Sequence, residues 1–383
     1  MPRRPLSLPA KLAWFAAAFA FCVIVFGAFV RLSNAGLSCP DWPTCYGQAT
    51  WPTHAHEIAR ANEAFPTRPV EAGKPWREQF HRMIAGTLGV LVLTLALVAV
   101  WRRPRARALV LLAAAAAALG VGLYMGGRHA ASALLSAAAI GLPLAVALRL
   151  PRAAPWRLAV VALAVIIFQA MLGMWTVTLL LKPIVVMGHL LGGLTTFALL
   201  AYAALRLSRV GADGEEFARL RRFVALGVVL LAGQIALGGW TSANYAALAC
   251  GYGGSAFPHC LGQWWPATDF RQGFVLWREI GVNYEGGVLD LPARTAIQLA
   301  HRLGALVVFC YLGWLAHRAA RAGLRGYGVA LGAALLAQVA LGIGNVTLGL
   351  PLPVATAHNA VAALLLFALL ALLARTQRRL DPA

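Results

Sequence analysis

Gln169-Ala-Met-Leu-Gly-Met-Trp-Thr-Val-Thr178 recurs, with substitutions, as Gln338-Val-Ala-Leu-Gly-Ile-Gly-Asn-Val-Thr347. Two further segments match in the same order. They are Trp76-Arg-Glu-Gln-Phe-His-Arg82 with Ala296-Ile-Gln-Leu-Ala-His-Arg302, and Cys45-Tyr-Gly-Gln48 with Cys260-Leu-Gly-Gln263. Ordered matches of this kind are typical of an internal duplication. The sequence therefore predicts two related four-helix halves, residues 1–208 and 209–383.

The composition indicates a membrane protein. The chain has 383 residues, of which 60% are hydrophobic and 12% charged, and its mean hydropathy is +0.72. Soluble domains carry about 25% charged residues, and disordered chains are far less apolar, so both classes are excluded. Ten apolar segments are each near the roughly 20 residues that a spanning helix needs. They lie at 13–30, 79–101, 107–125, 130–148, 157–180, 184–205, 221–240, 294–316, 327–349 and 354–374.

Charge predicts the orientation of these helices and explains the net charge of +20. If both termini are cytoplasmic, the cytoplasmic helix ends carry most of the 33 Lys and Arg, and the opposite side carries most of the 13 acidic residues. This asymmetry follows the positive-inside rule. The basic excess therefore indicates topology and not nucleic-acid binding. We expect an all-α polytopic protein with both ends in the cytoplasm.

The two long outer loops, about 31–77 and 241–293, each contain two cysteines. They are Cys39 and Cys45 in the first loop and Cys250 and Cys260 in the second. Disulfides form in extracytoplasmic compartments, so one disulfide in each loop is expected. A zinc site of these cysteines with His259 is an alternative, although no CxxC pair is present. Cys22 and Cys310 fall inside helices and are interpreted as small apolar residues.

The two halves differ by an insertion. His81 and His301 lie 220 residues apart, whereas His189 and His358 lie 169 apart. The first half therefore contains roughly fifty additional residues, which we assign to the Ala-rich stretch at about 104–154. This stretch is long enough for two membrane spans, and an even number preserves the orientation of every later helix. We expect an eight-helix core with an inserted peripheral pair.

Four histidines occupy duplicated positions near the outer ends of predicted spans: His81, His189, His301 and His358. Ionisable residues inside a membrane are costly and usually functional, although a single one can be a satisfied core residue. Each half supplies two imidazoles on non-adjacent helices, which suits the two axial positions of a haem iron. A bare copper or zinc ion would need further ligands at that depth. Each half is therefore interpreted as one bis-histidine haem pocket.

Residues beside these histidines support haem and distinguish the halves. Arg82 and Arg302 directly follow a ligand candidate and could pair with haem propionates, or could extend to lipid headgroups instead. Three residues before the histidine, the first half has Glu78 and the second has Gln298. A carboxylate can transfer protons and an amide cannot. Reaction chemistry is therefore expected in the first half, and an electron-transfer or structural haem in the second. Glu78 could alternatively cap its helix.

Several segments together resemble the haem A synthase family of cytochrome oxidase assembly. The first-half segments are Arg31-Leu-Ser-Asn-Ala-Gly-Leu-Ser-Cys-Pro-Asp-Trp-Pro-Thr-Cys45, Glu78-Gln-Phe-His-Arg82, Gln169 to Thr178 and Gly188-His-Leu-Leu-Gly-Gly193. His301-Arg302 and Ala357-His-Asn359 fit in the second half. The resemblance covers nearly the whole chain except about 104–154.

The resemblance implies a membrane oxidoreductase that converts haem O to haem A. A ring methyl is hydroxylated twice, and the geminal diol loses water to give a formyl group. The resemblance further implies that His81 and His189 hold the substrate haem, with Glu78 contributing to the oxidation. His301 and His358 are implied as ligands of a b-type haem. The outer cysteine pair of the first loop is implied in activity through redox exchange, with Cys250 and Cys260 as its structural counterpart.

Partners and location also follow from the resemblance. It implies haem O synthase and cytochrome oxidase assembly factors as partners, an electron acceptor such as a quinone or a redox protein, surrounding membrane lipid, and a bacterial inner membrane with haem sites toward the periplasm. It leaves a homo-oligomer open. Two other functions compete: a dihaem b-type cytochrome that relays electrons from quinol, and a haem-handling or transport protein. A relay across the membrane would place haems at two depths, whereas the four histidines share one. No GxxxxGK[ST] nucleotide-binding motif supports transport.

Overall fold

The computed structural model describes residues 6–151, 154–208, 210–211 and 214–378. Within these ranges the regular structure is helical, apart from two isolated β-bridges. Ten helices are long and apolar enough to cross a membrane: α1 (Leu8–Leu32), α3 (Pro75–Val100), α4 (Pro104–Met125), α5 (His129–Arg149), α6 (Pro155–Thr178), α7 (Pro183–Leu207), α8 (Glu215–Ala243), α10 (Leu291–Arg321), α11 (Arg325–Thr347) and α12 (Leu352–Arg375). The predicted all-α integral membrane protein with ten spans is confirmed.

Three short helices lie in the outer loops: α2 (Ala55–Ala64), η1 (Gly253–Ser255) and α9 (Phe270–Gly273). The spans begin and end within a few residues of the predicted limits. The orientation of the two ends concerns residues 1–5 and 379–383, which lie outside the described residues, and stays a prediction.

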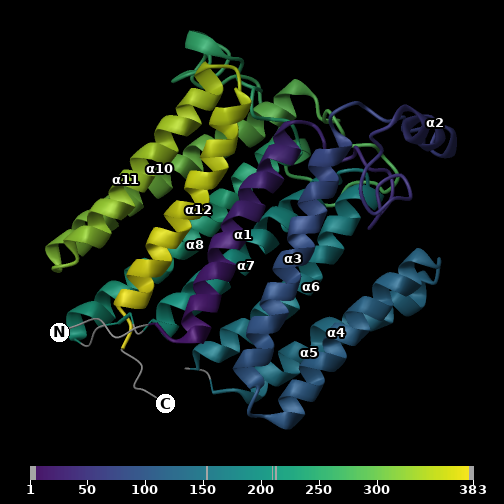
Figure 1. Ribbon diagram of the computed structural model, residues 1–383. Helices are drawn as coiled ribbons and strands as arrows, with labels where there is room; N and C mark the ends of the chain where they lie inside the picture. Colours follow the sequence, from purple (N-terminus) through teal and green to yellow (C-terminus); the bar gives the residue numbers. More distant parts are fainter. Residues whose placement is uncertain (1–5, 152–153, 209, 212–213, 379–383) are drawn as a thin grey trace. The chain divides into compact units, whose positions relative to one another are not determined.

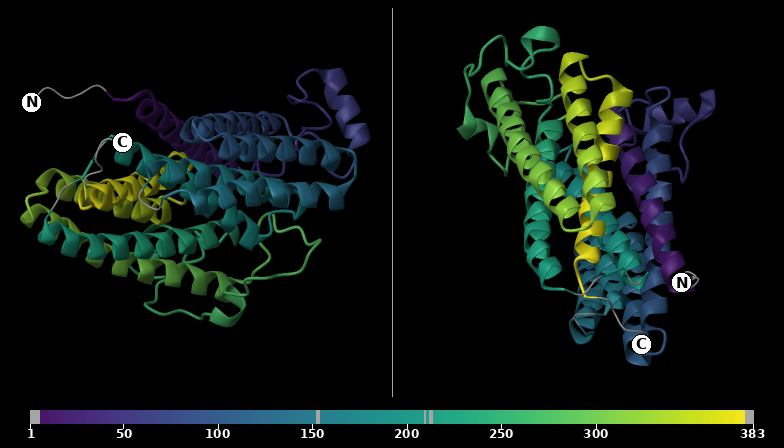
Figure 2. Two further views of the ribbon diagram at one scale, coloured as in Figure 1. Left: turned by 90° about the horizontal axis from the view of Figure 1, so that it is seen from below. Right: turned by 90° about the vertical axis from the view of Figure 1, so that its left-hand side faces the viewer.

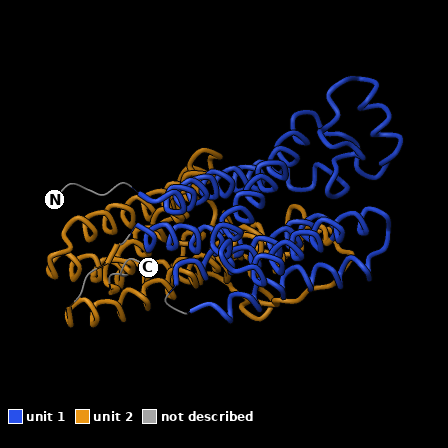
Figure 3. The backbone as a smooth tube through the Cα atoms, turned by 60° about the horizontal axis from the view of Figure 1, so that its bottom comes forward, with its two compact units in different colours: residues 1–178, 192–208 blue, residues 179–191, 209–383 orange. Residues whose placement is uncertain are grey.

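The chain forms two compact units, residues 1–178 with 192–208, and residues 179–191 with 209–383 (Figure 3). The beginning of α7, residues 183–191, thus groups with the second unit. The division at residues 208 and 209 that the sequence predicts stays a proposal, and Arg209 lies outside the described residues.

In the first unit, α3 packs between α1 and α6. The second part of α7 lies against α1 and α6, because Phe197 contacts Phe21 and Gly192 faces Gln169. The additional helices α4 and α5 pack mainly against each other, and α5 continues the contact to α6 (Figure 1). Residues 152–153 of the predicted insertion lie outside the described residues.

In the second unit, four long helices form a closed bundle in which each helix packs against two others (Figure 2). α10 contacts α8 and α11, and α12 contacts α11 and α8. Gly227 on α8 permits close packing, since a Cβ there would lie 3.2 Å from side-chain carbons of both Leu312 and Leu315. Such small residues allow membrane helices to approach without polar contacts.

Each outer loop is closed by one disulfide, as predicted: Cys39–Cys45 and Cys250–Cys260. The two loops share a local fold, because residues 45 and 48 pair by backbone hydrogen bonds, as do residues 260 and 263. All four loop cysteines are oxidised to disulfides, which removes the thiolates that the zinc alternative requires. Cys22 and Cys310 are free and exposed on membrane-spanning helices, consistent with small apolar residues.

Candidate active site

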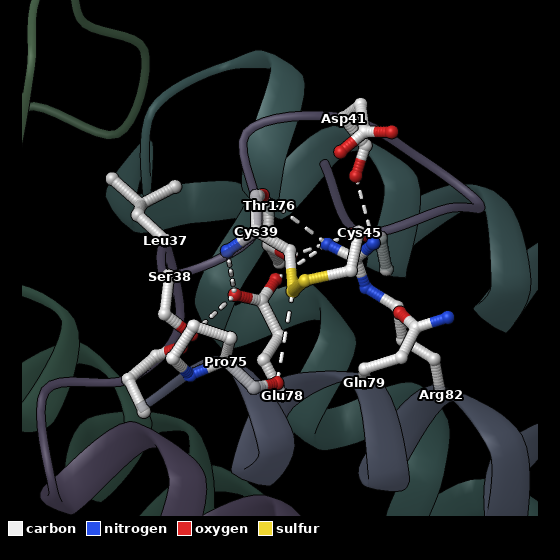
Figure 4. A network of polar contacts seen from close by, with 12 residues as sticks. Leu37, Ser38, Cys39, Asp41, Cys45, Pro75, Glu78, Gln79, Arg82 and Thr176 are labelled. Carbon is white, nitrogen blue, oxygen red and sulfur yellow. Dashed lines mark hydrogen bonds and ion pairs between the residues drawn. A yellow bond between two sulfur atoms is a disulfide. The ribbon is translucent and has the colours of Figure 1, made fainter. Parts of the chain in front are cut away.

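Glu78 lies in the first turn of α3 and is 5% exposed. Its Oε2 accepts hydrogen bonds from the backbone N–H of Cys39 at 2.8 Å and from Ser38 Oγ at 3.1 Å. Its Oε1 accepts from Arg82 Nη2 at 2.6 Å, one turn further along the helix (Figure 4). Three donors therefore surround this buried carboxylate. They fix the side chain of Glu78 against the first disulfide loop.

Arg82 connects α3 to the disulfide loop. Its Nη1 donates to the carbonyl oxygens of Asp41 at 2.7 Å and Thr44 at 2.6 Å. Nη2 also lies 3.4 Å from the carbonyl oxygen of Cys39, besides its bond to Glu78. This guanidinium is thus engaged with protein acceptors on both of its terminal nitrogens. A propionate that bound Arg82 through a terminal nitrogen would replace one of these acceptors.

The loop itself is ordered by Asp41. Its carboxylate accepts hydrogen bonds from Thr44 Oγ1 and from the backbone N–H groups of Tyr46 and Gly47. Gln79, the neighbour of Glu78, donates from Nε2 to the carbonyl oxygen of Ala49 at 2.7 Å. The first turn of α3 and the loop therefore form one hydrogen-bonded unit.

The second half repeats the contact between the arginine and the disulfide loop, but it has an amide where the first half has the carboxyl group of Glu78. Gln298 replaces Glu78 and is 4% exposed, and its Oε1 has no hydrogen-bond partner among the described residues. Arg302 Nη1 donates to the carbonyl oxygen of His259 at 2.9 Å. His259 precedes Cys260 as Thr44 precedes Cys45, so the two arginines make equivalent contacts. Arg302 Nη2 is buried and donates to no acceptor within the described ranges.

Three of the predicted ligand histidines pack against a glycine of a neighbouring helix. A Cβ built on Gly27 would lie 2.8 Å from Cε1 of His81. On Gly238 it would lie 3.1 Å from Cε1 of His301, and on Gly342 it would lie 3.1 Å from Cε1 of His358. Each imidazole therefore occupies a space that only glycine leaves open. In the repeated decapeptide, Gly173 stands at the position of Gly342.

Glutamine side chains contact both histidines of the second half. Gln234 Nε2 lies 3.0 Å from Nδ1 of His301 and donates to its carbonyl oxygen at 2.9 Å. Gln338 Nε2 lies 3.2 Å from Nε2 of His358. Gly27 and Gly238 are equivalent, because each faces the histidine of its own half. Counting four residues back from each, Val23 is the first-half counterpart of Gln234. The second half thus orients its histidines by hydrogen bonds that Val23 cannot supply for His81.

The second bundle fits a haem by three observations. His301 and His358 lie within electrostatic range of each other. Nδ1 of His358 is buried without a hydrogen-bond partner in the described part of the chain. The unengaged Nη2 of Arg302 offers a donor for a carboxylate. Two imidazoles, glycine-lined space and a free guanidinium N–H are the groups that a haem with propionates requires.

Among the predicted site residues, the structure brings together Glu78, Arg82, Cys39 and Cys45, and separately groups His301 with His358. His81 belongs to the first unit and His189 to the second, so their pairing stays a prediction.

Sequence reasoning missed the groups that support these side chains. They are Ser38, Asp41, Gln79, the glutamines at 234 and 338, and the glycines at 27, 238 and 342. The repeated decapeptide could have indicated two of these residues. It begins with Gln338 and contains Gly342, and both lie against His358.

A family model described as cytochrome oxidase assembly protein (COX15-CtaA) matches residues 10–126 and 123–370. This is most of the chain. The chain belongs to this family.

Two named relatives of the family match along nearly their full length. A heme A synthase of Shewanella oneidensis is 39% identical over 354 residues, which cover 92% of this chain and 91% of the relative. A heme A synthase of Rhizorhabdus wittichii is 28% identical over 395 residues, which cover 96% of this chain and 95% of the relative. The family assignment therefore includes the α4–α5 region, where the two family matches meet.

Proposed function

We propose that this protein is a haem A synthase, an oxidoreductase that converts a ring methyl of haem O to the formyl group of haem A. The observation that carries the proposal is the asymmetry between the halves: the first has the buried carboxyl group of Glu78, paired with Arg82, where the second has the amide of Gln298. Membership of the cytochrome oxidase assembly family and relatives named heme A synthase support it. The quinol-relay and haem-handling alternatives have no comparable support.

The first half, residues 1–208, is proposed to hold substrate haem O through His81 and His189. The second half, residues 209–383, is proposed to hold a haem b through His301 and His358. When bound, haem iron supplies the oxidising chemistry. The chain's own contribution is to ligate and orient the ring and to keep a proton-accepting group beside it.

Glu78 is proposed as the catalytic proton acceptor. Oxidation of a methyl group releases protons, and an ionised carboxylate can accept one at Oε1 or Oε2. Arg82 and the N–H of Cys39 hold this carboxylate in position. The amide of Gln298 cannot perform this step, which restricts the reaction to the first half.

Propionate binding is proposed to differ between the halves. Arg302 has an Nη2 group without a protein partner in the described residues and would donate directly to a haem b propionate. The terminal nitrogens of Arg82 would bind the propionate of the substrate by exchanging a loop carbonyl for it. Binding through these nitrogens would couple substrate entry to movement of the disulfide loop.

The disulfides are proposed to have different roles. The backbone N–H of Cys39 bonds to the carboxylate of Glu78, so Cys39–Cys45 is the candidate for redox exchange. Cys250–Cys260 is proposed as a structural bond of the matching loop. We propose a bacterial inner membrane with the haem sites toward the periplasm. Haem O synthase, oxidase assembly factors and a quinone or redox protein are the proposed partners, and homo-oligomers are compatible with this function.

Co-expression tests the function. The chain is expressed with a haem O synthase in a host that lacks haem A, and the extracted pigments are separated by chromatography. Haem A is expected in the presence of the chain and absent without it. Recovery of haem B and unchanged haem O alone would contradict the enzyme and favour a relay.

The ligand assignment of the second half has its own test. His301→Ala and His358→Ala should each abolish the low-spin b-type absorption spectrum of the purified protein. His317→Ala, an exposed histidine lower on α10, is the matched control and should leave the spectrum unchanged. Retention of the low-spin signal in either ligand variant would overturn the assignment.

A further inference from the structure

A cavity of about 690 Å³ opens between the beginning of α8 and the end of α10, both in the second unit. It lies at the helix ends opposite the outer loops, far along α10 from His301. The residues that matter for its chemistry are four arginines, one carboxylate and one aromatic ring: Arg219, Arg222, Arg318, Arg321, Glu216 and Phe223. Neither proposed haem site uses any of them.

The cavity concentrates positive charge. Two arginines come from α8 and two from α10, and all four are exposed. None forms an ion pair within the described ranges, and Glu216 is the single acidic lining residue. Four arginines that line one space repel each other, and an anion between them relieves this repulsion. The site therefore favours a ligand with more than one negative charge.

An apolar surface adjoins the charged cavity. Phe223 contacts Trp314 with ring centroids 5.1 Å apart, and Arg318 lies over Trp314 at 5.8 Å. Further along α8, Leu226 is 47% exposed and Val229 is 66% exposed. α8 has 29 residues, more than the roughly 20 that cross the hydrocarbon layer, so its first turns extend to headgroup level. A ligand at this site would contact arginines with its charged end and exposed aliphatic side chains with its apolar part.

We propose that this cavity binds the phosphate headgroup of an anionic phospholipid from the surrounding membrane, with preference for a lipid that carries two phosphates. Arginine pairs with phosphate through two parallel hydrogen bonds, and two arginines from each helix suit two phosphates. Basic pockets between membrane helices on the cytoplasmic side are suited to such headgroups. The bound lipid would hold the ends of α8 and α10 together, and these helices carry Gln234 and His301.

Native mass spectrometry of the full-length detergent-solubilised protein tests this proposal. The probes are cardiolipin, phosphatidylglycerol, phosphatidylcholine and inorganic pyrophosphate. The pocket variant is Arg219→Gln/Arg318→Gln. The control is Arg221→Gln/Arg325→Gln, which removes two exposed arginines on the same side that do not line the cavity. We expect cardiolipin to bind at least about tenfold more weakly to the pocket variant, and equally to the control and the unaltered protein.

Three results would overturn the proposal: equal loss of cardiolipin in both variants, no loss in the pocket variant, or displacement of cardiolipin by equimolar pyrophosphate. The last would assign the site to a free phosphate compound. All four arginines are exposed, so the variants should fold, and an unchanged thermal unfolding midpoint checks this directly. The experiment tests the lipid site separately from the proposed enzyme activity, because lipid binding is measured without any catalytic turnover.

Discussion

The backbone N–H of Cys39 donates a hydrogen bond of 2.8 Å to Oε2 of Glu78. This contact joins the only buried carboxylate described in the spans to a residue of a disulfide, 39 positions earlier in the chain. Any change in the loop alters the position of the carboxylate, and any change in the charge of Glu78 alters the loop. The proposed proton acceptor and the proposed redox pair are therefore one structural unit.

Glu78→Gln should retain bound haem and lose formyl production. The amide keeps the size of the side chain and cannot accept the proton, and removal of a catalytic acid or base costs about 10²–10⁴-fold in rate. Haem A is quantified by chromatography and bound haem by absorption. Gln298→Glu is the reciprocal control and should leave the rate unchanged. A normal rate in Glu78→Gln would show that Glu78 has no catalytic role.

Removal of the first disulfide should affect activity more than removal of the second. Each short loop contributes about 2 kcal/mol through its cross-link, so Cys39→Ser/Cys45→Ser and Cys250→Ser/Cys260→Ser should lower the unfolding midpoint similarly. Only the first variant loosens the loop whose Cys39 backbone N–H holds Glu78 in position. Haem A yield is measured beside thermal unfolding. Equal activity in the two variants would refute the coupling between Glu78 and its loop.

Gln234→Val should weaken haem binding in the second half only. The substitution introduces the residue found at position 23 and removes the amide beside Nδ1 of His301. Loss of such an outer partner lowers affinity for a metal centre by about 10–100-fold. Haem titration and the electron paramagnetic resonance spectrum of the low-spin haem provide the measurement. Ile235→Val on the same turn is the control, and an unaltered spectrum in Gln234→Val would contradict a positioning role.

Sequence patterns predicted the helices well because membrane spans depend on apolar length, which composition reports directly. The observed ends of some helices differ from the predicted ends where the local backbone geometry stops the helix. α6 ends at Thr178 and not at 180, since Leu180 and Leu181 adopt positive φ angles of 49° and 59°. α10 begins at Leu291 and not at 294, because Asp290 caps it by accepting a hydrogen bond from the N–H of Ala293.

Comparison of the two halves selected Glu78, because Gln298 stands at the equivalent place, and its catalytic role stays a prediction. Groups without a counterpart in the other half, and backbone atoms, escaped this comparison. Gln234 was overlooked because its counterpart is Val23, so no repeat marked it. The acceptors of Arg82 are carbonyl oxygens, which every residue possesses, and no pattern of side chains identifies them.

Tyr46 should make the first outer loop sensitive to alkali. Burial raises the pKa of Tyr46 to about 12, and its hydroxyl donates to the carbonyl oxygen of Arg68 at 3.1 Å. The neutral phenol is therefore favoured in the folded protein. Between pH 10 and about 12 the unfolded chain loses this proton while the folded chain keeps it, so stability falls as pH rises through that range.

The thermal unfolding midpoint of Tyr46→Phe, compared with that of the unaltered protein from pH 8 to pH 12, measures this effect. The variant should be less stable by about 1 kcal/mol at pH 8, where the hydrogen bond is lost, and this deficit should shrink above pH 10. Tyr252→Phe, whose ring is 72% exposed in the second loop, is the control and should show no such trend. A constant deficit across the pH range would contradict the assignment.

Gly27→Ala should displace the ring of His81 and impair substrate haem binding, although alanine favours helix formation. A Cβ at residue 27 would lie 2.8 Å from Cε1 of His81, closer than carbon atoms approach, so the imidazole must rotate. Gly89→Ala on α3 is the matched control, since no atom lies within 4 Å of its Cβ. The control should gain about 0.5–1 kcal/mol in stability with unchanged haem binding. The helix propensity of alanine alone would stabilise both variants equally. A Gly27→Ala protein that binds haem O as tightly as the control would show that haem binding does not require the present position of His81.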